Sequence, residues 1–546
     1  MKRTLVIVLA AVALSSCSRV GTQNTGTEAT QRRNSFTIPH TLRYATAEDI
    51  VGLNPHLVQQ TTVGLMSSLT MAWLVKFNER NQPIPELATQ VPTKANGGIS
   101  ADGKTITYHL QKGVRWSDGK PFTADDVVFS TQVVLNPANN EVSRTGWDLI
   151  TRTDEPDKYT VVYHLKKPYA SFFVTFFSSA GANPCVLPKH LLGGLPNINT
   201  ASYNALPVGI GPFKYSQWRR GDSVTMVPNP NYFRGRPKLQ KVIFKLIPDR
   251  NTVMSQLQSR ELDLWYPVPG NFYARVKALP SFAVLKQPSY YFNHIDFNLS
   301  SPKLKERPVR EALRYAIDRA TLRDKVGHGI GILQESIASP AAPYSDQNIA
   351  KVPFDLAKAN QILDSAGWRR GADGTRAKSG IKLSLNYATS TGSPDVDTQL
   401  ELIRSWWKQI GVDMQIHHYL SSLLFATYQS GGIIQAGKFD VVNFAWGLDP
   451  IGDFSTLYAC SQIPPNGQND VHWCNKRADG AMDRFKTLFD GKERQPFSNI
   501  VQEELVKDVP TIVTTVREDV WAYNSDLKNF RVNQVSPFDD FMTVDV

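Results

Sequence analysis

The sequence predicts an α/β protein with more than one domain. The chain has 546 residues, more than a single hydrophobic core usually serves, so we expect two or three domains. Strand patterns alternate with helical patterns along most of the chain, which is typical of a mixed fold. Residues 439–446 form an almost continuous apolar run, the pattern of a parallel strand that is buried on both faces.

Composition and charge narrow the classes of function. The chain is 41% apolar and 20% charged, which is ordinary for a soluble protein. Its formal net charge of +11 would suit a nucleic acid or an anionic membrane surface. Lysine and arginine occur in no run longer than a pair, so we expect a dispersed basic surface and no nucleic-acid partner.

Residues 1–17 have the features of an export signal. Two basic residues follow Met1, and residues 5–14 form an apolar segment that is too short to span a bilayer. The sequence L-S-S-C that ends at Cys17 resembles the lipobox of bacterial lipoproteins, in which the cysteine receives the lipid. An ordinary signal peptide with a chance cysteine is the alternative. Residues 18–35 are mostly polar, as in a flexible tether.

Strand and helix patterns follow one another beyond this tether. A helix is expected to carry Thr61, Thr62 and Met66. The expected strands are residues 105–110, 241–247, 291–299, 382–388 and 439–446, and the further expected helices are residues 251–259, 308–319, 357–368 and 400–409.

The stretch at residues 102–130 carries the clearest local signals. Residues 105–110 alternate between polar and apolar side chains, as a half-buried strand does. A Ser-Asp-Gly turn follows, and Thr123 then has the position of a helix N-cap. Asp125 and Asp126 fall in the first helical turn, where backbone N–H groups favour carboxylates. These signals alone predict a well-defined piece of a mixed α/β domain.

Three cysteines remain beyond Cys17. In an exported protein, Cys460 and Cys474 are expected to form a disulfide. A zinc site that includes His472 is the alternative, but no C-x-x-C motif accompanies it. Cys185, between proline and valine, is most simply a buried free thiol.

The stretch at residues 102–130 closely resembles the signature block of the extracytoplasmic solute-binding proteins of peptide ABC importers, the dipeptide, oligopeptide and nickel class. The shared pattern is G-K-T-x-T-Y-x-L-x-K-G-V-x-W-S-D-G-K-P-F-T-A-D-D-V-V-F-S. G-I-G-P-F at residues 209–213 and N-P-N-Y-F-R-G-R-P at residues 229–237 resemble further family motifs, with Phe233 where the family has tryptophan. The resemblance covers nearly all of residues 40–546.

The resemblance implies a two-lobed, periplasmic-binding-protein-like α/β fold, similar to type II, with a cleft between the lobes and an inserted β-rich domain. The implied parts are a lipoprotein signal peptide (1–17), a tether (18–35), a discontinuous domain I (36–78, 207–293 and 521–546), the inserted domain II (79–206) and domain III (294–520). The hinge is expected near residues 290–298 and 515–525.

The resemblance also implies the function and the ligand-binding residues. It implies a lipid-anchored binding protein that captures peptides in the cleft and delivers them to the permease subunits of an ABC importer, as a monomer without a cofactor or a bound metal. Leu53 and Asn54 lie in the L-N-P segment that resembles the family's first ligand-facing loop, and Thr62 follows on a helix. Relatives bind the peptide ammonium through an aspartate three residues after a tryptophan, the offset of Asp449 from Trp446.

Two departures from the family pattern leave the identity of the ligand undecided. The segment after Trp446 is shorter than in dipeptide-binding members, so Asp449 matches either the ammonium anchor or a later Asp-Pro pair. Dipeptide binders carry an arginine after the strand at residues 382–388, whereas residues 389–393 contain none. We therefore do not expect strict dipeptide specificity.

Two rival functions are weighed against peptide capture. The same fold could bind a non-peptide solute, such as a sugar oligomer or a nickel complex. An exported hydrolase is the rival from another class, but the sequence contains no P-loop, G-x-S-x-G, H-E-x-x-H or EF-hand pattern. We therefore expect a binding protein and no enzyme.

Overall fold

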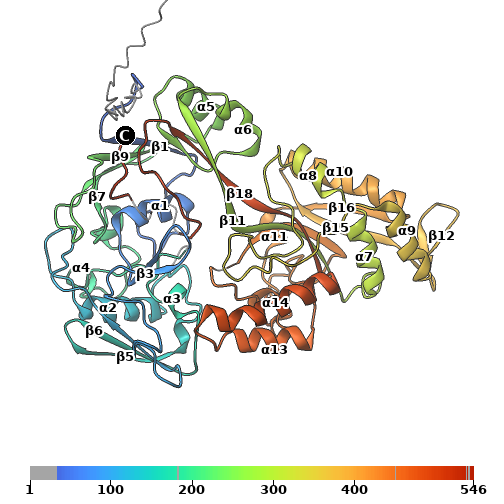
Figure 1. The fold of residues 1–546 in the computed structure, drawn as a ribbon, viewed down its shortest axis with the longest axis horizontal. Helices are drawn as coiled ribbons and strands as arrows, with labels where there is room; N and C mark the ends of the chain where they lie inside the picture. Colours follow the sequence, from blue (N-terminus) through green and yellow to red (C-terminus); the bar gives the residue numbers. More distant parts are fainter. Residues whose placement is uncertain (1–33, 181–183, 449, 536–537, 539–540) are drawn as a thin grey trace, which may run out of the picture. The chain divides into compact units, whose positions relative to one another are not determined.

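The largest element of the protein is a ten-stranded mixed sheet. A computed structural model describes residues 34–180, 184–448, 450–535, 538 and 541–546. The sheet has the order β16-β15-β17-β11-β18-β10-β1-β9-β8-β7 (Figure 1). Its strands are β16 (Asp413–Tyr419), β15 (Ser384–Ser390), β17 (Val441–Gly447), β11 (Phe282–Phe297), β18 (Thr511–Asn524), β10 (Leu264–Trp265), β1 (Thr41–Thr46), β9 (Lys241–Leu246), β8 (Ser223–Pro228) and β7 (Phe213–Arg219).

Two long antiparallel strands, β11 and β18, join the two halves of this sheet. The first part of β11 pairs from Phe282 to Pro288, and pairing resumes at Phe292 after a shift in register. The strand therefore begins well before the expected residue 291. The ladder between β11 and β18 is therefore interrupted at residues 289–291, as at a β-bulge. The hinge itself stays a prediction.

The first lobe contains β10, β1, β9, β8 and β7, and a buried ion pair ties its strands together. Arg43 at the start of β1 donates to both carboxylate oxygens of Asp263, from Nε at 2.7 Å and from Nη2 at 2.8 Å. Asn524 at the end of β18 donates to the same carboxylate at 3.1 Å. Helices α1 (Thr61–Thr70), α5 (Arg250–Gln258) and α6 (Gly270–Lys277) belong to this half of the chain.

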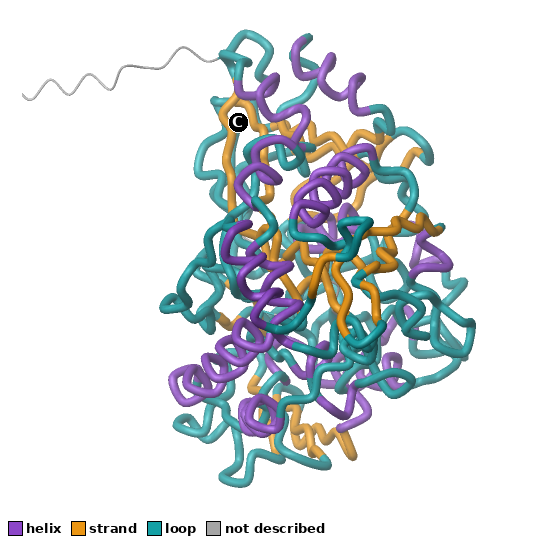
Figure 2. Tube along the Cα trace, turned by 90° about the vertical axis from the view of Figure 1, so that its right-hand side faces the viewer, coloured by secondary structure: helices purple, strands orange, loops and turns teal. Residues whose placement is uncertain are grey.

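The second lobe packs helices on β16, β15 and β17. A buried cluster joins Leu385 of β15 to Leu313, Leu363 and Trp407 of three helices, and Figure 2 shows helices beside the strands. These helices are α7 (Arg307–Tyr315), α9 (Leu356–Ser365) and α10 (Pro394–Gln409).

The prediction of one helix over residues 308–319 is wrong. The structure has two helices, α7 and α8 (Arg319–Lys325). Asp318 accepts a hydrogen bond from the backbone N–H of Thr321 at 3.0 Å and caps the second helix. An N-cap residue has a non-helical backbone, so the capping carboxylate ends one helical run and begins the next. The other expected strands and helices are present. Apart from the early starts of β11 at Phe282 and of the helix Pro394–Gln409, their ends differ from the expected ones by at most three residues.

The signature stretch, residues 102–130, lies in the segment that connects the first-lobe strands β1 and β7. Thr123 is the N-cap of α2 (Ala124–Leu135), as predicted. Asp126 accepts from the Thr123 backbone at 3.1 Å, from the Trp116 indole at 3.3 Å and from the Lys189 backbone at 3.0 Å. The motif therefore holds the helix start, a buried tryptophan and a distant loop together, which is a structural role. A three-stranded sheet, β4 (Thr105–His109), β6 (Thr160–Leu165) and β5 (Ile150–Asp157), lies in the same segment.

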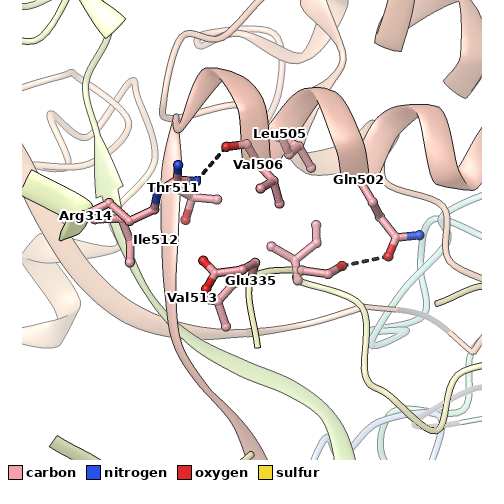
Figure 3. A pocket seen from close by; sticks show the side chains of 10 residues that line it. Arg314, Glu335, Gln502, Leu505, Val506, Thr511, Ile512 and Val513 are labelled. Atoms are coloured by element: carbon pink, nitrogen blue, oxygen red, sulfur yellow. Dashed lines mark hydrogen bonds between the residues drawn. The ribbon is translucent and has the colours of Figure 1, made fainter. Parts of the chain in front are cut away.

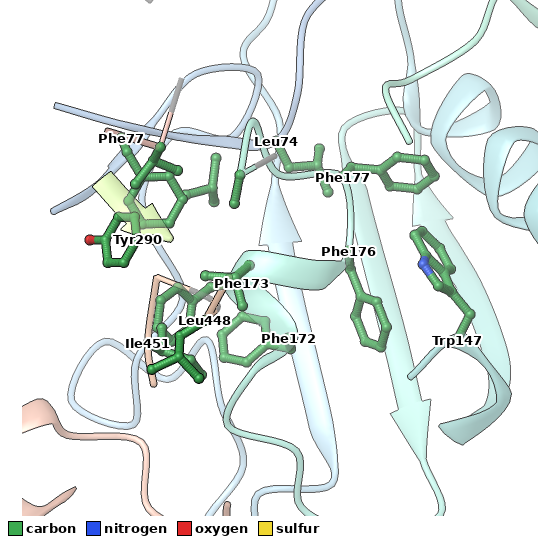
Figure 4. Close-up of a cluster of buried hydrophobic side chains, with 14 of the residues drawn as sticks. Leu74, Phe77, Trp147, Phe172, Phe173, Phe176, Phe177, Tyr290, Leu448 and Ile451 are labelled. Atoms are coloured by element: carbon green, nitrogen blue, oxygen red, sulfur yellow. The ribbon is translucent and has the colours of Figure 1, made fainter. Parts of the chain in front are cut away.

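This segment shares a hydrophobic core with the second lobe. Figure 4 shows Phe172 and Phe173 near Leu448 and Ile451, which follow β17 in the chain. Arg494 of α14 (Gly491–Asp508) lies over the Phe173 ring, with its guanidinium carbon 5.7 Å from the centroid. One core therefore contains side chains of the expected domain II (79–206) and of the expected domain III (294–520). The domain boundaries proposed from the sequence stay a prediction.

The remaining elements are short, apart from one helix. They are β2 (Val75–Phe77), β3 (Pro83–Pro85), β12 (Arg369–Arg370), β13 (Arg376–Lys378), β14 (Ile381–Lys382), α3 (Phe172–Thr175), α4 (Lys189–Leu192), α11 (Ser421–Leu424), α12 (Ser455–Tyr458) and α13 (Lys476–Phe485). Across the described ranges, no helix has both the length and the apolar character needed to cross a membrane. The expected signal peptide at residues 1–17, its Cys17 and most of the expected tether lie outside the described residues.

The Arg43–Asp263 pair yields a stability prediction. Asp263→Ala should lower the free energy of unfolding by about 3–5 kcal/mol, because it leaves a mostly buried guanidinium without its counter-charge. Urea denaturation measures this change. As a matched control, Asp222→Ala removes an exposed carboxylate 3.8 Å from Arg219 and should leave stability nearly unchanged. Equal effects of the two substitutions would contradict the role given to Asp263.

Candidate functional site

The C-terminal half of β17 is the most unusual part of the sheet. Val441 and Val442 are buried, but Phe444 and Trp446 are only half-buried and Ala445 is exposed. The prediction of a parallel strand buried on both faces is therefore wrong for the second half of the run. β17 pairs in parallel with β15 only at Val441 and Val442, and it pairs antiparallel with β11 along its length. In the described part of the chain, the β15 side of residues 443–447 has no strand partner.

A small pocket lies over β17 and its paired neighbour β11. It has a volume of about 10 Å³, the space of about one water molecule. The lining side chains come from β11, β17, α12 and a loop that precedes α13, and they are His294, Asp296, Phe444, Trp446, Leu457, Tyr458, Gln468, Asp470 and Val471.

A disulfide-closed loop supplies one wall of the pocket. Cys460 and Cys474 are joined by a disulfide, as expected. Asn469 is fully buried inside this loop, and its side-chain amide donates to the carbonyls of Ala459 at 2.9 Å and Trp473 at 2.7 Å. Its neighbours in sequence, Gln468 and Asp470, both line the pocket. The cross-link and the asparagine therefore fix the position of both polar side chains.

His294 presents a polar atom without a partner to this pocket. Its Nδ1 lies 2.8 Å from Asp296 Oδ1. Because a carboxylate accepts, this nitrogen carries the proton. The ring packs against Phe444 and Phe292, with centroid distances of 4.3 and 4.8 Å. Nε2 is buried and makes no hydrogen bond with any described residue, which costs free energy unless a ligand or a water satisfies it.

Asp470 is a buried acid on the opposite wall. It accepts a hydrogen bond from Gln435 Nε2 at 2.7 Å. Burial, and next the negative charge of Asp296, raise the pKa of Asp470 to about 8. The same two causes raise the pKa of Tyr458 well above its ordinary value. At neutral pH Asp470 is therefore mainly protonated.

Exposed apolar side chains continue the site beyond the pocket. Leu420 is 67% exposed and Phe425 is 48% exposed, unusually high fractions for side chains of this size. The Phe425 ring lies 5.7 Å from Phe444, whose ring lies 6.0 Å from Trp446. Aromatic side chains therefore run from a surface segment around α11 to the end of β17.

The structure separates the residues expected to bind ligand. Trp446 lines the pocket, whereas Leu53, Asn54 and Thr62 are buried in the half of the chain that contains β1 and α1. Asn54 donates to Asn204 at 2.8 Å, and Thr62 shares a hydroxyl hydrogen bond of 2.6 Å with Thr46. Asp449 lies outside the described residues. The binding roles of these residues stay predictions.

Sequence reasoning missed His294, Asp296, Gln468 and Asp470. Gln468 and Asn469 belong to a segment that the resemblance associated only with the disulfide. His294 and Asp296 are separated by one residue within an expected strand, so they share a face. That spacing in an apolar strand is the signal that could have singled them out.

The described chain contains other cavities. One of about 10 Å³ lies between α14 and the start of β18 (Figure 3). Its walls are fixed by hydrogen bonds from Arg314 to the Val506 carbonyl and from Ser336 to Gln502, both 2.7 Å. A hollow of about 510 Å³ includes Arg319, whose guanidinium is already bound to Glu335 and to three backbone carbonyls.

The structure does not support the alternative of a zinc site with His472 and Cys474. Cys474 is part of the disulfide and is not available as a thiolate. The described residues contain no group of three or more histidine, cysteine or acidic side chains that could hold a metal ion. Cys185 is a buried free thiol, as predicted, and its carbonyl lies 2.8 Å from His56 Nε2.

Comparisons with known proteins find similarity to bacterial solute-binding proteins. A model of the bacterial extracellular solute-binding proteins, family 5 middle region, matches residues 82–467. The oligopeptide-binding protein AppA of Bacillus subtilis is 27% identical over 454 residues, which cover 82% of this chain and 80% of the relative. Heme-binding protein A of Haemophilus influenzae is 28% identical over 524 residues, 90% of each chain.

A solved structure gives the same result for the fold. The structure of NikZ from Campylobacter jejuni in complex with Ni(L-His) is 25% identical and superposes with a TM-score of 0.72. The match covers 92% of this chain and 98% of that one. The expected two-lobed α/β fold is thereby confirmed.

The raised pKa of Asp470 yields a prediction for stability against pH. The folded protein holds this proton up to a pH of about 8, whereas the unfolded chain releases it near pH 3.8. Stability therefore decreases as the pH rises through this window, because the folded state binds more protons. Asp470→Asn cannot ionise, so its melting temperature relative to the parent protein should be higher at pH 9 than at pH 5.

The control for this experiment is Asp483→Asn, which changes a carboxylate that is 76% exposed. Its melting temperature relative to the parent should not depend on pH in this window. Thermal denaturation of the three proteins at both pH values gives the comparison. A constant difference between parent and Asp470→Asn would show that Asp470 has an ordinary pKa in the folded state.

Proposed function

Because the chain belongs to the bacterial extracellular solute-binding proteins of family 5, we propose that it captures peptides between its lobes and delivers them to an ABC importer. Members of this class are binding proteins of ABC importers rather than enzymes. The observation that carries the peptide proposal is the unpaired edge of β17 at residues 443–447. A strand edge can bind an extended peptide through main-chain hydrogen bonds that do not depend on its sequence.

The side chains around this edge fit the same proposal. Successive residues of a bound strand point to opposite sides, so alternate peptide side chains would meet the aromatic surface of Phe425, Phe444 and Trp446. Aromatic rings supply apolar contact area without demanding one particular partner. Recognition through the backbone together with a general apolar wall suits a protein that accepts many peptides.

Lobe closure around the ligand would complete the site. β11 and β18 connect the lobes, and the register of their pairing shifts at residues 289–291. Hinges in two-lobed binding proteins are a few residues that absorb large changes in backbone angles. We propose that this interruption is the hinge, and that closure excludes water from the peptide and strengthens its polar contacts.

A non-peptide solute is the second candidate within the same class. One relative is named a heme-binding protein, and one solved relative holds Ni(L-His). Heme and the nickel complex need no free strand edge, so the unpaired part of β17 favours peptides. The protein needs no resident cofactor for capture of either kind.

We further propose that the mature protein is a monomer held at the outer face of a membrane by a lipid on Cys17. The support is the lipobox-like sequence and the polar stretch at residues 18–35 that follows it. A single lipid chain gives only marginal membrane binding, so stable anchoring takes more than one chain. Such an anchor would keep the protein close to the permease subunits of its importer.

Trp446→Ala tests peptide capture. The parent protein should retain peptides from a library of short random peptides, and the captured peptides should be recovered intact, as a binding protein requires. Trp446→Ala should lose about 2 kcal/mol of affinity for a retained peptide, because a large aromatic contact beside the strand edge is removed. Isothermal titration calorimetry measures the loss.

The matched control is Trp218→Ala, on the distant edge strand β7. It should bind the same peptide with the affinity of the parent. If the parent retains no peptide but binds heme or a nickel–histidine complex, the second candidate replaces the first. Cleavage of the peptides would contradict a pure binding function.

Cys17→Ala tests the anchor. The variant should be released from the membrane fraction, because the lipid would have no attachment point, while peptide affinity stays that of the parent. Fractionation in high salt, followed by mass spectrometry of the N-terminal peptide, measures both location and lipid. Membrane retention of Cys17→Ala under these conditions would rule out the lipid on this residue.

A further inference from the structure

Strands β7, β8 and β9 of the first lobe have one face that is not part of a hydrophobic core. Val242 and Phe244 of β9 belong to the buried cluster on one side of the sheet. Because successive side chains of a strand point to opposite faces, Lys241 and Lys245 of the same strand point to the other side.

Strand pairing places two basic residues of β7 on this same side. Arg219 is paired with Ser223, which is paired in turn with Lys245. Lys214 is paired with Val227, the neighbour of a buried residue of β8. The three strands contain no aspartate and no glutamate. We call this surface the basic face, and its charged residues are Lys214, Arg219, Lys241 and Lys245.

The helices of the first lobe leave the basic face uncovered. Helices α5 and α6 share a cluster with Ala45 of β1, which is paired with Lys245, but no described residue of β7, β8 or β9 belongs to that cluster. Arg219 and Lys241 are exposed, and the other two basic residues are half-buried. Within the described chain, only Arg219 of the four forms an ion pair, with Asp222 at 3.8 Å. The positive charge of this face is therefore largely uncompensated.

The chain enters the first lobe beside the basic face. Phe36 packs against the cluster of α5 and α6, which lies on the same side of the sheet. The carbonyl of His40 accepts a hydrogen bond from the backbone N–H of Lys241 at 3.2 Å. Ile38, between these two contacts, is 47% exposed. Fewer than 20 residues separate Phe36 from Cys17, and a chain of that length reaches at most about 65 Å.

We propose that the basic face rests on the anionic lipid headgroups of the membrane that holds Cys17. The inference rests on the proposed lipid anchor and adds an electrostatic contact to it. A lipid chain and a basic patch together hold a protein far more stably than a single chain does. The short link to Cys17 keeps the basic face within reach of the bilayer surface, and the exposed Ile38 would meet the boundary between headgroups and acyl chains.

Vesicle binding by proteins without the lipid tests this contact. All variants carry Cys17→Ala, so the attached lipid does not dominate the result. The probes are vesicles of phosphatidylcholine alone and vesicles that also contain about 30% phosphatidylglycerol, which supply the negative surface potential. The readout is the apparent dissociation constant for each kind of vesicle, measured by flotation. The ratio of the two constants isolates the electrostatic contribution.

The test variant replaces three lysines by glutamine, at positions Lys214, Lys241 and Lys245. It should bind the anionic vesicles about 100-fold more weakly than the Cys17→Ala protein, because each basic residue near an anionic surface contributes about 5-fold. The matched control makes the same change in net charge on the second lobe, at the exposed residues Lys351, Lys358 and Lys408. It should bind both kinds of vesicle as the Cys17→Ala protein does.

Two further measurements separate charge from folding and shape. Arginine in place of the same three lysines of the basic face should keep the preference for anionic vesicles, since it keeps the charge. About 500 mM NaCl should abolish the preference seen at about 50 mM, since salt screens exposed charges. Each variant should keep its melting temperature and its peptide affinity, because β17 lies on the other side of the β11–β18 pair in the sheet.

Three outcomes would overturn the assignment. They are equal affinity of the Cys17→Ala protein for both kinds of vesicle, equal losses in the two triple variants, and binding to a DNA duplex without a preference for anionic vesicles. The last result would assign the basic face to another polyanion. Failure of the lipid anchor gives a different result, which is retention of Cys17→Ala by membranes in high salt, where the electrostatic contact is screened.

Discussion

The pairing of β11 with β18 is the constraint on which the rest of the structure depends. These two strands are the neighbours through which both halves of the ten-stranded sheet are connected. A continuous sheet would resist bending, because each rotation between the halves would stretch ladder hydrogen bonds. The shift in register between Pro288 and Phe292 interrupts this ladder at one place. The same strand then continues as the wall of the pocket, with His294 and Asp296 only a few residues further on.

The site combines a rigid wall with an open backbone edge. Rigidity comes from the disulfide and from Asn469, which fasten the loop that carries Asp470. Openness comes from β15, which diverges from β17 after Val442. A preorganised polar wall lowers the cost of ordering on binding. An open edge adds hydrogen bonds that any peptide backbone can make, so affinity does not require a particular side-chain sequence.

Local signals in the sequence predicted much of the fold. Of the site, they predicted only the loop that the Cys460–Cys474 disulfide closes. The helix start at Thr123 and the Cys460–Cys474 disulfide follow from short-range chemistry and were predicted correctly. The half-exposed end of β17 was not, because an apolar run gives the same pattern whether it faces a core or a binding surface. Asp470 and His294 are distant in the chain and meet only in the folded protein. No local pattern contains that information.

One close contact joins the end of β17 to the interruption in the β11–β18 ladder. Gly447 is the last residue of β17 and is paired with Tyr291 of β11, which lies in the interruption of the β11–β18 ladder. A Cβ atom at position 447 would lie 3.0 Å from the Tyr291 ring, so a larger residue would displace the tyrosine. Tyr291 is itself 51% exposed. The interruption of the β11–β18 ladder and the end of β17 are therefore in direct contact through this ring, so a side chain added at position 447 would perturb both.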